Sequence, residues 1–256
     1  MVSLPVFSHP PIDIHSHFNH GSPFDCPGTP VHRRDLAFLK QAYDHIGVCA
    51  VGMSTFASVL EHTECILEEN RYLQELTRKT DWMYQWVVID PRQPDTYRQA
   101  EEILKEEKTL GIKIHPAYHG YDIEAYADEL FAFAAEHRTF LLMHPAKIDK
   151  MPFYANRYPE MKLIIAHFGS VDHVNAVANA KYGNIFVDTS GGASNLNNIL
   201  EYAVEQVGSE KIFFGTDTYS CPFQFGRIAL ADLPLKDKEN ILWKNAMVHF
   251  PKAFKE

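Results

Sequence analysis

Eight short runs rich in apolar and β-branched residues recur at fairly regular spacing along the chain. They span residues 12–17, 47–54, 83–90, 110–115, 139–144, 162–167, 184–189 and 211–217. Most are nearly continuous in apolar residues, with no strict polar alternation, which is typical of parallel strands covered on both faces. Segments of helical period separate these runs.

The helical segments complete a repeating strand-then-helix pattern. Helices are predicted over 34–46, 57–80, 95–109, 123–137 and 195–207, with a last one over 238–250 that closes the wall. Eight such units predict an α/β fold, a single-domain (β/α)₈ TIM barrel over 1–256, close to the usual size of about 250 residues. A doubly wound open sheet is disfavoured because no glycine-rich phosphate loop follows the first run. Residues 18–32, rich in Gly and Pro, predict a long loop over the barrel mouth.

Charge and cysteine usage restrict the class of protein. The formal net charge of -9 argues against a nucleic-acid or anionic-membrane partner, because phosphate binding needs a basic face. The four cysteines form no C-x-x-C pair, as expected for reduced thiols. No apolar stretch is long enough to span a membrane and the N-terminus lacks a signal pattern, so we expect a soluble cytoplasmic protein. The sequence leaves a homo-oligomer open.

The first run ends in His15-Ser16-His17, two histidines separated by one residue. Side chains alternate between faces in an extended strand, so both imidazoles point the same way and can close on one cation. Two histidines in a core can equally form hydrogen bonds, and a zinc-like site needs further ligands.

The other runs supply such ligands at equivalent places. The eight runs finish in His17, Ser54, Asp90, His115, His144, His167, Thr189 and Asp217. All strand ends of this kind gather on one face of a (β/α)₈ barrel, where the active sites of that fold lie. Taken singly, each histidine could be a hydrogen-bonded core residue, and Asp217 could simply cap the turn after its strand. Their convergence favours a metal site.

These motifs resemble the amidohydrolase superfamily over essentially the whole chain. The resemblance rests on His15-Ser16-His17, on His144, on His167-Phe168-Gly169 and on Thr216-Asp217, one motif per expected strand. The stretch GIKIHP at 111–116 and the late Lys244-Asn245-Ala246 are similar to predicted metal-dependent TIM-barrel hydrolases related to aminocarboxymuconate semialdehyde decarboxylase.

The resemblance implies a metal site. His15, His17, His144 and Asp217 would hold a divalent metal, with zinc as the expected ion, and a second metal is left open. Asp217 and His167 would be catalytic: Asp217 accepts the proton of the attacking water, and His167 orients that water, stabilises the oxyanion or binds a second metal.

The role of Lys113 stays open at this point. It could bridge two metals as a carboxylated lysine, contact substrate, or pair with a buried acid such as Asp13 or Asp188. His115 lies on the same strand face, nearer the mouth.

Specificity is expected from loops at the mouth. The candidate substrate-binding residues are Phe18, Lys113, His115 and Tyr219, and the expected partner is a small molecule. Lys147 is expected to be a solvated surface lysine and Cys221 a packed thiol, although a substrate contact and a soft metal ligand are the respective alternatives.

The predicted function is metal-dependent hydrolysis of an amide, lactone or ester. A non-oxidative decarboxylase of a carboxylated aromatic or dienoic acid is the first alternative, and a catalytically inactive barrel with a structural metal is the second. A phosphoesterase or nuclease barrel also uses His-x-His on its first strand. The lack of an acidic ligand at the end of the fourth run and the negative charge argue against it.

Overall fold

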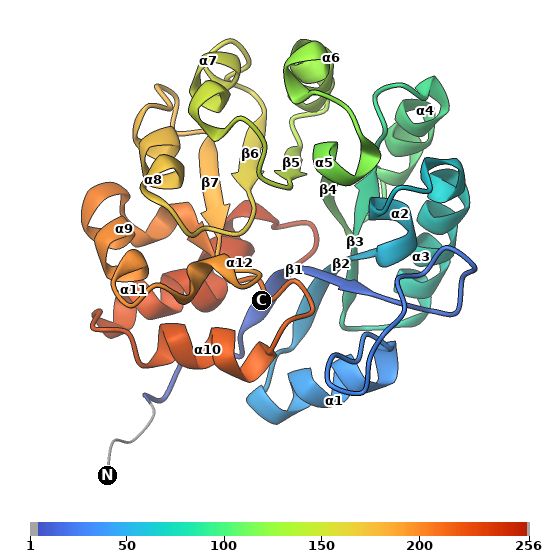
Figure 1. The fold of residues 1–256 in the computed structure, drawn as a ribbon. Helices are drawn as coiled ribbons and strands as arrows, with labels where there is room; N and C mark the ends of the chain where they lie inside the picture. The colour runs from blue at the N-terminus through green and yellow to red at the C-terminus, as the bar shows by residue number, and fades with distance from the viewer. Residues whose placement is uncertain (1–4, 255–256) are drawn as a thin grey trace.

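Eight parallel strands form one sheet in chain order, each paired with the next along the sequence (Figure 1). This computed structural model describes residues 5–254. Backbone bonds from Ile14 N to Phe214 O (2.9 Å) and from Asp217 N to His15 O (2.8 Å) join the segment after the last strand to the first. The predicted (β/α)₈ barrel is therefore confirmed. The strands are β1 (Ile12–Phe18), β2 (Ala50–Thr55), β3 (Met83–Val88), β4 (Thr109–Ile114), β5 (Phe140–Met143), β6 (Lys162–Ile165), β7 (Ile185–Asp188) and β8 (Ile212–Phe213).

Helices surround the barrel. They begin where the sequence offers caps: the Asp35 side chain accepts from Phe38 N ahead of α1, and Gly47, at a φ of 74°, ends that helix. The α-helices are α1 (Leu36–Ile46), α2 (Phe56–Val59), α3 (Ile66–Lys79), α4 (Pro94–Ile103), α5 (Pro116–His119), α6 (Ile123–Glu136), α7 (Met151–Ala155), α8 (Val171–Ala178), α9 (Ile199–Val207), α10 (Cys221–Ala229), α11 (Leu235–Glu239) and α12 (Asn245–His249). None of the helices within residues 5–254 has the length and apolar character to cross a membrane.

Three predicted elements differ in detail. The helix expected over 57–80 is broken into α2, a 3₁₀ turn (Thr63–Cys65) and α3, because the backbone at Leu60 is extended. The strand expected over 211–217 is regular only at Ile212–Phe213, since Asp217 and Thr218 both have positive φ. The predicted last helix runs through α11, a π-helical turn (Asn240–Lys244) and α12.

The interior of the barrel is filled from below by aromatic side chains, which we call the floor. Trp86, Phe140, Phe186 and Phe213 pack there with Phe250 of the C-terminal segment. All five are at least nine-tenths buried, and each ring contributes about 1.5–3 kcal/mol of transfer free energy. The floor closes that end of the barrel and leaves the other end to polar residues.

Candidate metal centre

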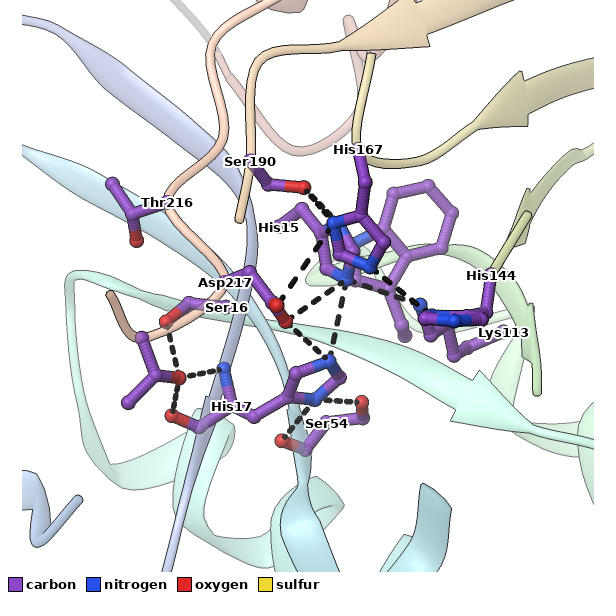
Figure 2. A network of polar contacts seen from close by, with 12 residues as sticks. His15, Ser16, His17, Ser54, Lys113, His144, His167, Ser190, Thr216 and Asp217 are labelled. Atoms are coloured by element: carbon purple, nitrogen blue, oxygen red, sulfur yellow. Dashed lines mark hydrogen bonds and ion pairs between the residues drawn. The ribbon is translucent and has the colours of Figure 1, made fainter. Parts of the chain in front are cut away.

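Along the strands that form the aromatic floor, polar side chains follow the floor residues toward the strand ends. On β7, Phe186 belongs to the floor and Asp188, two residues later, is fully buried above it. On β5, the apolar Leu142 is likewise followed two residues later by His144, just after the strand ends. Side chains two residues apart share a strand face, so the layer nearest the strand ends collects the histidines and carboxylates (Figure 2). We call this layer the mouth.

Three ligand atoms from β1 and the segment after β8 converge at the mouth. His15 Nε2 and His17 Nε2 are 3.2 Å apart, and Asp217 Oδ1 lies 3.8 Å from the first and 3.3 Å from the second. Figure 2 shows the carboxylate of Asp217 directed at both rings. His15 and His17 therefore share a face, as the His-x-His spacing predicts.

The outer nitrogens of the two rings fix their tautomers. His15 Nδ1 donates to the Asp188 carboxylate at 2.9 Å, and His17 Nδ1 donates to the Ser54 carbonyl at 3.2 Å. A neutral imidazole has one N–H, so both Nε2 atoms then carry lone pairs that face each other and the Asp217 oxygen. Three acceptors directed at one point fit a divalent cation, with partners on the Nδ1 atoms as in metal-binding histidines.

Strained backbone conformations direct the side chains of Asp217 and His167 into this layer. Both residues have positive φ, 54° and 59°, which is uncommon for residues other than glycine. His15 O accepts from Asp217 N at 2.8 Å, and Asp188 Oδ1 accepts from His167 N at 3.2 Å. These bonds hold the two side chains in conformations that a relaxed turn would not select.

His167 lies beside the three ligand atoms. Its ring stacks on that of His15, with centroids 5.3 Å apart, and its Nδ1 lies 3.9 Å from Asp217 Oδ2. Ser190 Oγ donates to Asp188 and lies 2.9 Å from His167 Nδ1, from which it can accept. His167, His15 and Asp188 form a second group whose ligand atoms lie within 4.8 Å of one another.

His144 reaches the mouth but belongs to neither group of three within residues 5–254. Its Nδ1 lies 3.1 Å from His167 Nε2, and its ring stacks on His115 with centroids 3.9 Å apart. If His167 donates through Nδ1 to Ser190, then His144 donates through Nδ1 and keeps its lone pair on Nε2. The role of His144 as a metal ligand stays a prediction.

Lys113 lies at the centre of the polar layer. Its ammonium donates to His15 Nε2 at 3.0 Å and, within the described chain, has no carboxylate within 4.0 Å. Asp13 instead accepts from Thr216 Oγ1 at 2.6 Å and from His15 N at 2.9 Å, so it ties β1 to the segment after β8. Burial lowers the pKa of Lys113 to about 8.

Burial also sets the protonation of the other groups. It lowers the pKa values of His15, His17 and His167 well below the usual range and that of His144 to about 4, with further lowering from nearby cations. Neutral imidazoles are the form that binds metals. Burial raises the pKa of Asp217 to about 7, against the opposing effect of Lys113.

A pocket of about 160 Å³ opens over the mouth. The loop of residues 18–32 reaches it through Cys26 and His32, as expected. The other lining residues are His17, Arg34, Phe56, Val59, Leu60, His115, Tyr118, His144, His167, Asp217 and Tyr219. The prediction for Phe18 is wrong, because its side chain is fully buried in the core between the sheet and the outer helices.

Sequence reasoning missed Asp188 and Ser190 as parts of the site and Arg34 as a cation lining the pocket. Asp188 was considered only as a partner for Lys113. The spacing Asp188-Thr189-Ser190 was the available signal, since it places both polar residues on the face that Phe186 turns inward. Nothing in the sequence marks Arg34, which falls at the start of the helix predicted over 34–46 and in the structure lies just before α1.

Two loop residues, Lys147 and Cys221, have the structural roles expected from the sequence, a surface lysine and a packed thiol. Lys147 is exposed and pairs with Glu124 at 3.4 Å. Cys221 is 3 % exposed at the start of α10, and burial raises the pKa of its thiol, which makes it unreactive. Neither lies in a group of candidate ligands among the described residues.

Comparison with known proteins agrees with this architecture. A family model described as Amidohydrolase matches residues 12–251. A search of curated proteins found no match.

Solved structures share the fold at low identity. A dihydroxybenzoic acid decarboxylase from Polaromonas sp. JS666, with bound manganese and 2-nitroresorcinol, is 16% identical with a TM-score of 0.75 over 94% of this chain and 97% of that one. A 5-carboxyvanillate decarboxylase from Novosphingobium aromaticivorans, also with manganese, is 15% identical, TM-score 0.74, over 95% and 96%. A probable 2-pyrone-4,6-dicarboxylic acid hydrolase from Acinetobacter baumannii is 13% identical, TM-score 0.70, over 95% and 100%.

Proposed function

The chain belongs to the amidohydrolase family, and we propose that it is a metal-dependent hydrolase of a small amide, lactone or ester. One observation carries the proposal: the Asp217 carboxylate faces two groups at once. Its Oδ1 lies 3.3 Å from His17 Nε2, and its Oδ2 lies 3.9 Å from His167 Nδ1. A single carboxylate can therefore bind a cation and exchange a proton beside it.

The cation would be held by His15, His17 and Asp217, with His144 as the further predicted ligand. When bound, a divalent cation lowers the pKa of a coordinated water from 15.7 to about 7 and polarises a carbonyl oxygen. Asp188 and Ser54 keep the two Nδ1 atoms protonated, so the Nε2 lone pairs stay directed at the ion. Zinc is the metal we expect, and manganese is the alternative because both decarboxylase structures described above contain it.

Side chains of the mouth carry out the proton transfer and the positioning that hydrolysis requires. Asp217 accepts the proton of the attacking water and returns it to the leaving group. His167 orients the attacking water, and Ser190 accepts from its Nδ1 and so holds the ring in place. Lys113 adds a positive charge on the floor side of the same space.

The pocket restricts the substrate. Its volume of about 160 Å³ lies below the range of about 300–1,000 Å³ for drug-sized ligands, so the substrate is small. Arg34 lines the pocket and Lys113 lies beneath it, so we expect a substrate that carries a carboxylate near its reacting carbonyl. His115 and Tyr219 are the proposed contacts on the walls.

Decarboxylation is the second candidate. The two cations favour a carboxylated substrate, and structures that share this fold include the dihydroxybenzoic acid and 5-carboxyvanillate decarboxylases described above. A purely structural metal is disfavoured because His17, His167 and Asp217 border a pocket, whereas a structural site is closed by protein ligands.

The test is a substrate screen on enzyme reconstituted with zinc or with manganese. Lactones, esters and amides of small carboxylic acids are followed by acid release, and hydroxylated benzoic acids by CO₂ release. We expect acid release that a small hydroxamate inhibits. Release of CO₂ without any hydrolysis would replace the first candidate with the second, and neither product with either metal would contradict both.

A further inference from the structure

A second polar region lies at the opposite end of the barrel, beneath the floor. A pocket of about 280 Å³ opens there, between the starts of β5 and β6 and the C-terminal segment. Its basic or titratable lining residues are His137, Arg138, Lys162, His249 and Lys252, and its apolar wall includes Phe140 and Phe250. Within residues 5–254, no aspartate or glutamate lines it.

Lys162 is the central cation of this pocket. The side chain is partly buried, and its ammonium lies 5.1 Å from the centre of the Phe140 ring and donates to His249 Nδ1 at 3.3 Å. No described carboxylate lies within 4.0 Å of it. An ammonium has three donors, so Lys162 keeps donors for a further acceptor.

Other positive groups crowd the same region. Lys211, which precedes β8, lies 4.7 Å from the Phe186 ring and donates to Gly183 O at 2.7 Å. His249 packs between the two rings, with centroids 5.8 Å from Phe140 and 4.8 Å from Phe186. Burial, with Lys162 and Lys211 nearby, lowers the pKa of His249 to about 4. The positive charges therefore repel one another, and the nearest carboxylates, Glu160 and Glu210, do not line the pocket.

Arg138 stands at the rim of the pocket. It follows α6 in the left-handed region, at a φ of 47°, and pairs with Glu160 at 3.5 Å. Both side chains are mostly exposed, and such surface pairs are weak, so the guanidinium can turn toward a bound anion. The chain as a whole carries a net charge of -9, so this concentration of cations is not part of a generally basic surface.

We propose that this pocket binds a small organic anion, a phosphate or carboxylate attached to an apolar group. The oxyanion pairs with Lys162 and Arg138, and the apolar group packs on Phe140 and Phe250. The ligand would join the start of β6, the turn before β5 and the C-terminal segment. Because the floor separates it from the mouth, this anion stabilises the fold or regulates it and is not the substrate.

The test uses the full chain and two probes with the same ring, phenyl phosphate and benzoate, which distinguish a phosphate site from a carboxylate site. Inorganic phosphate measures the contribution of charge alone. We expect saturable binding by calorimetry, tighter for one ring-bearing anion than for inorganic phosphate. Lys162→Met should weaken it at least tenfold, and Arg138→Met should weaken it less.

Two further variants locate the binding. Lys150→Met removes an exposed lysine that pairs with Asp149 on another loop, and it should bind the probes like the unmodified chain. His17→Ala removes a predicted metal ligand at the mouth and should leave binding intact. Equal affinity in Lys162→Met, loss in His17→Ala, or no saturable binding to the unmodified chain would each overturn the proposal. If Lys162→Met fails to fold, the double variant Lys252→Met/Arg138→Met takes its place, and it should bind the probes more weakly than the unmodified chain.

Discussion

The mouth and the floor of the barrel are built from the same strands but from opposite chemistry. β7 places Phe186 in the floor and Asp188 in the mouth, two residues apart. The segment through β8 places Phe213 in the floor and Asp217 in the mouth, four residues apart and beyond the regular strand. On β7, one strand period of two residues separates a ring that excludes water from a carboxylate that needs a partner.

The contrast between floor and mouth explains how a site with buried charges can be stable. The apolar floor supplies transfer free energy and closes the barrel, whereas every buried charge at the mouth costs desolvation. That cost explains why Asp188 accepts four hydrogen bonds, from His15, His167 and the backbone and hydroxyl of Ser190. Substitutions at the mouth should therefore alter metal content and turnover, and those at the floor should alter stability.

The largest effect is expected from replacing His15 and His17 together with alanine. Two of the three converging ligand atoms disappear, so the protein should lose its metal and all turnover. Elemental analysis of the purified variant measures this directly. His249→Ala, a histidine beneath the floor, is the control and should retain the metal. Full metal content in the double variant would contradict the site.

Asp217→Asn should leave the fold intact and reduce kcat by about 10²–10⁴-fold, the range for loss of a general base. The amide keeps the shape of the side chain but cannot accept the proton. Steady-state kinetics with the substrate from the screen measures kcat, and thermal unfolding checks the fold. Unchanged turnover would refute the catalytic role.

Phe213→Ala tests the floor. The ring is 1 % exposed and packs against Phe140, Phe186 and Phe250, so its loss should lower the free energy of unfolding by about 3–5 kcal/mol. Urea denaturation gives that free energy. Metal content in the folded variant should stay the same, and its loss would show that floor and mouth are not separable.

Ser190→Ala sharpens the comparison within the mouth. The hydroxyl lies 3.0 Å from His15 Nδ1 and 2.9 Å from His167 Nδ1, so its removal frees the His167 ring to turn and leaves His15 held by Asp188 alone. We expect a loss of about 10–100-fold in metal affinity or activity, as for other residues that orient metal ligands. Competition with a chelator measures the affinity. Ser22→Ala, in the exposed loop, is the control.

The smallest effect is expected from a carboxylate outside the barrel. Glu239 accepts from Ser8 and Lys244, and these bonds lower its pKa to about 2. A lowered pKa stabilises the folded state above the ordinary pKa of 4.5, and the contribution is lost as the pH falls toward 2. Glu239→Gln should cost about 1 kcal/mol or less at neutral pH because the amide oxygen can still accept from Ser8 and Lys244 and only the charge is lost, and the difference should vanish near pH 2. Unfolding free energies measured across this pH range would contradict the assignment if the difference stayed constant.

The barrel and most of its mouth can be predicted from the order of the amino acids alone. Eight apolar runs with helical segments between them are local patterns, and the period of two places His15 beside His17 without any knowledge of the fold. Because the strand ends of such a barrel share one face, His167 and Asp217 are predicted to lie near these two histidines.

The contact partners of these residues depend on the three-dimensional fold and could not be predicted. Phe18 continues β1 but turns into the outer core, and Arg34 reaches the pocket from a loop whose path no local pattern fixes. The tautomers of His15 and His17 depend on Asp188 and Ser54, which are 173 and 37 residues away. Long-range contacts of this kind follow from the closure of the barrel, because strand pairing brings together residues whose separation in sequence carries no signal.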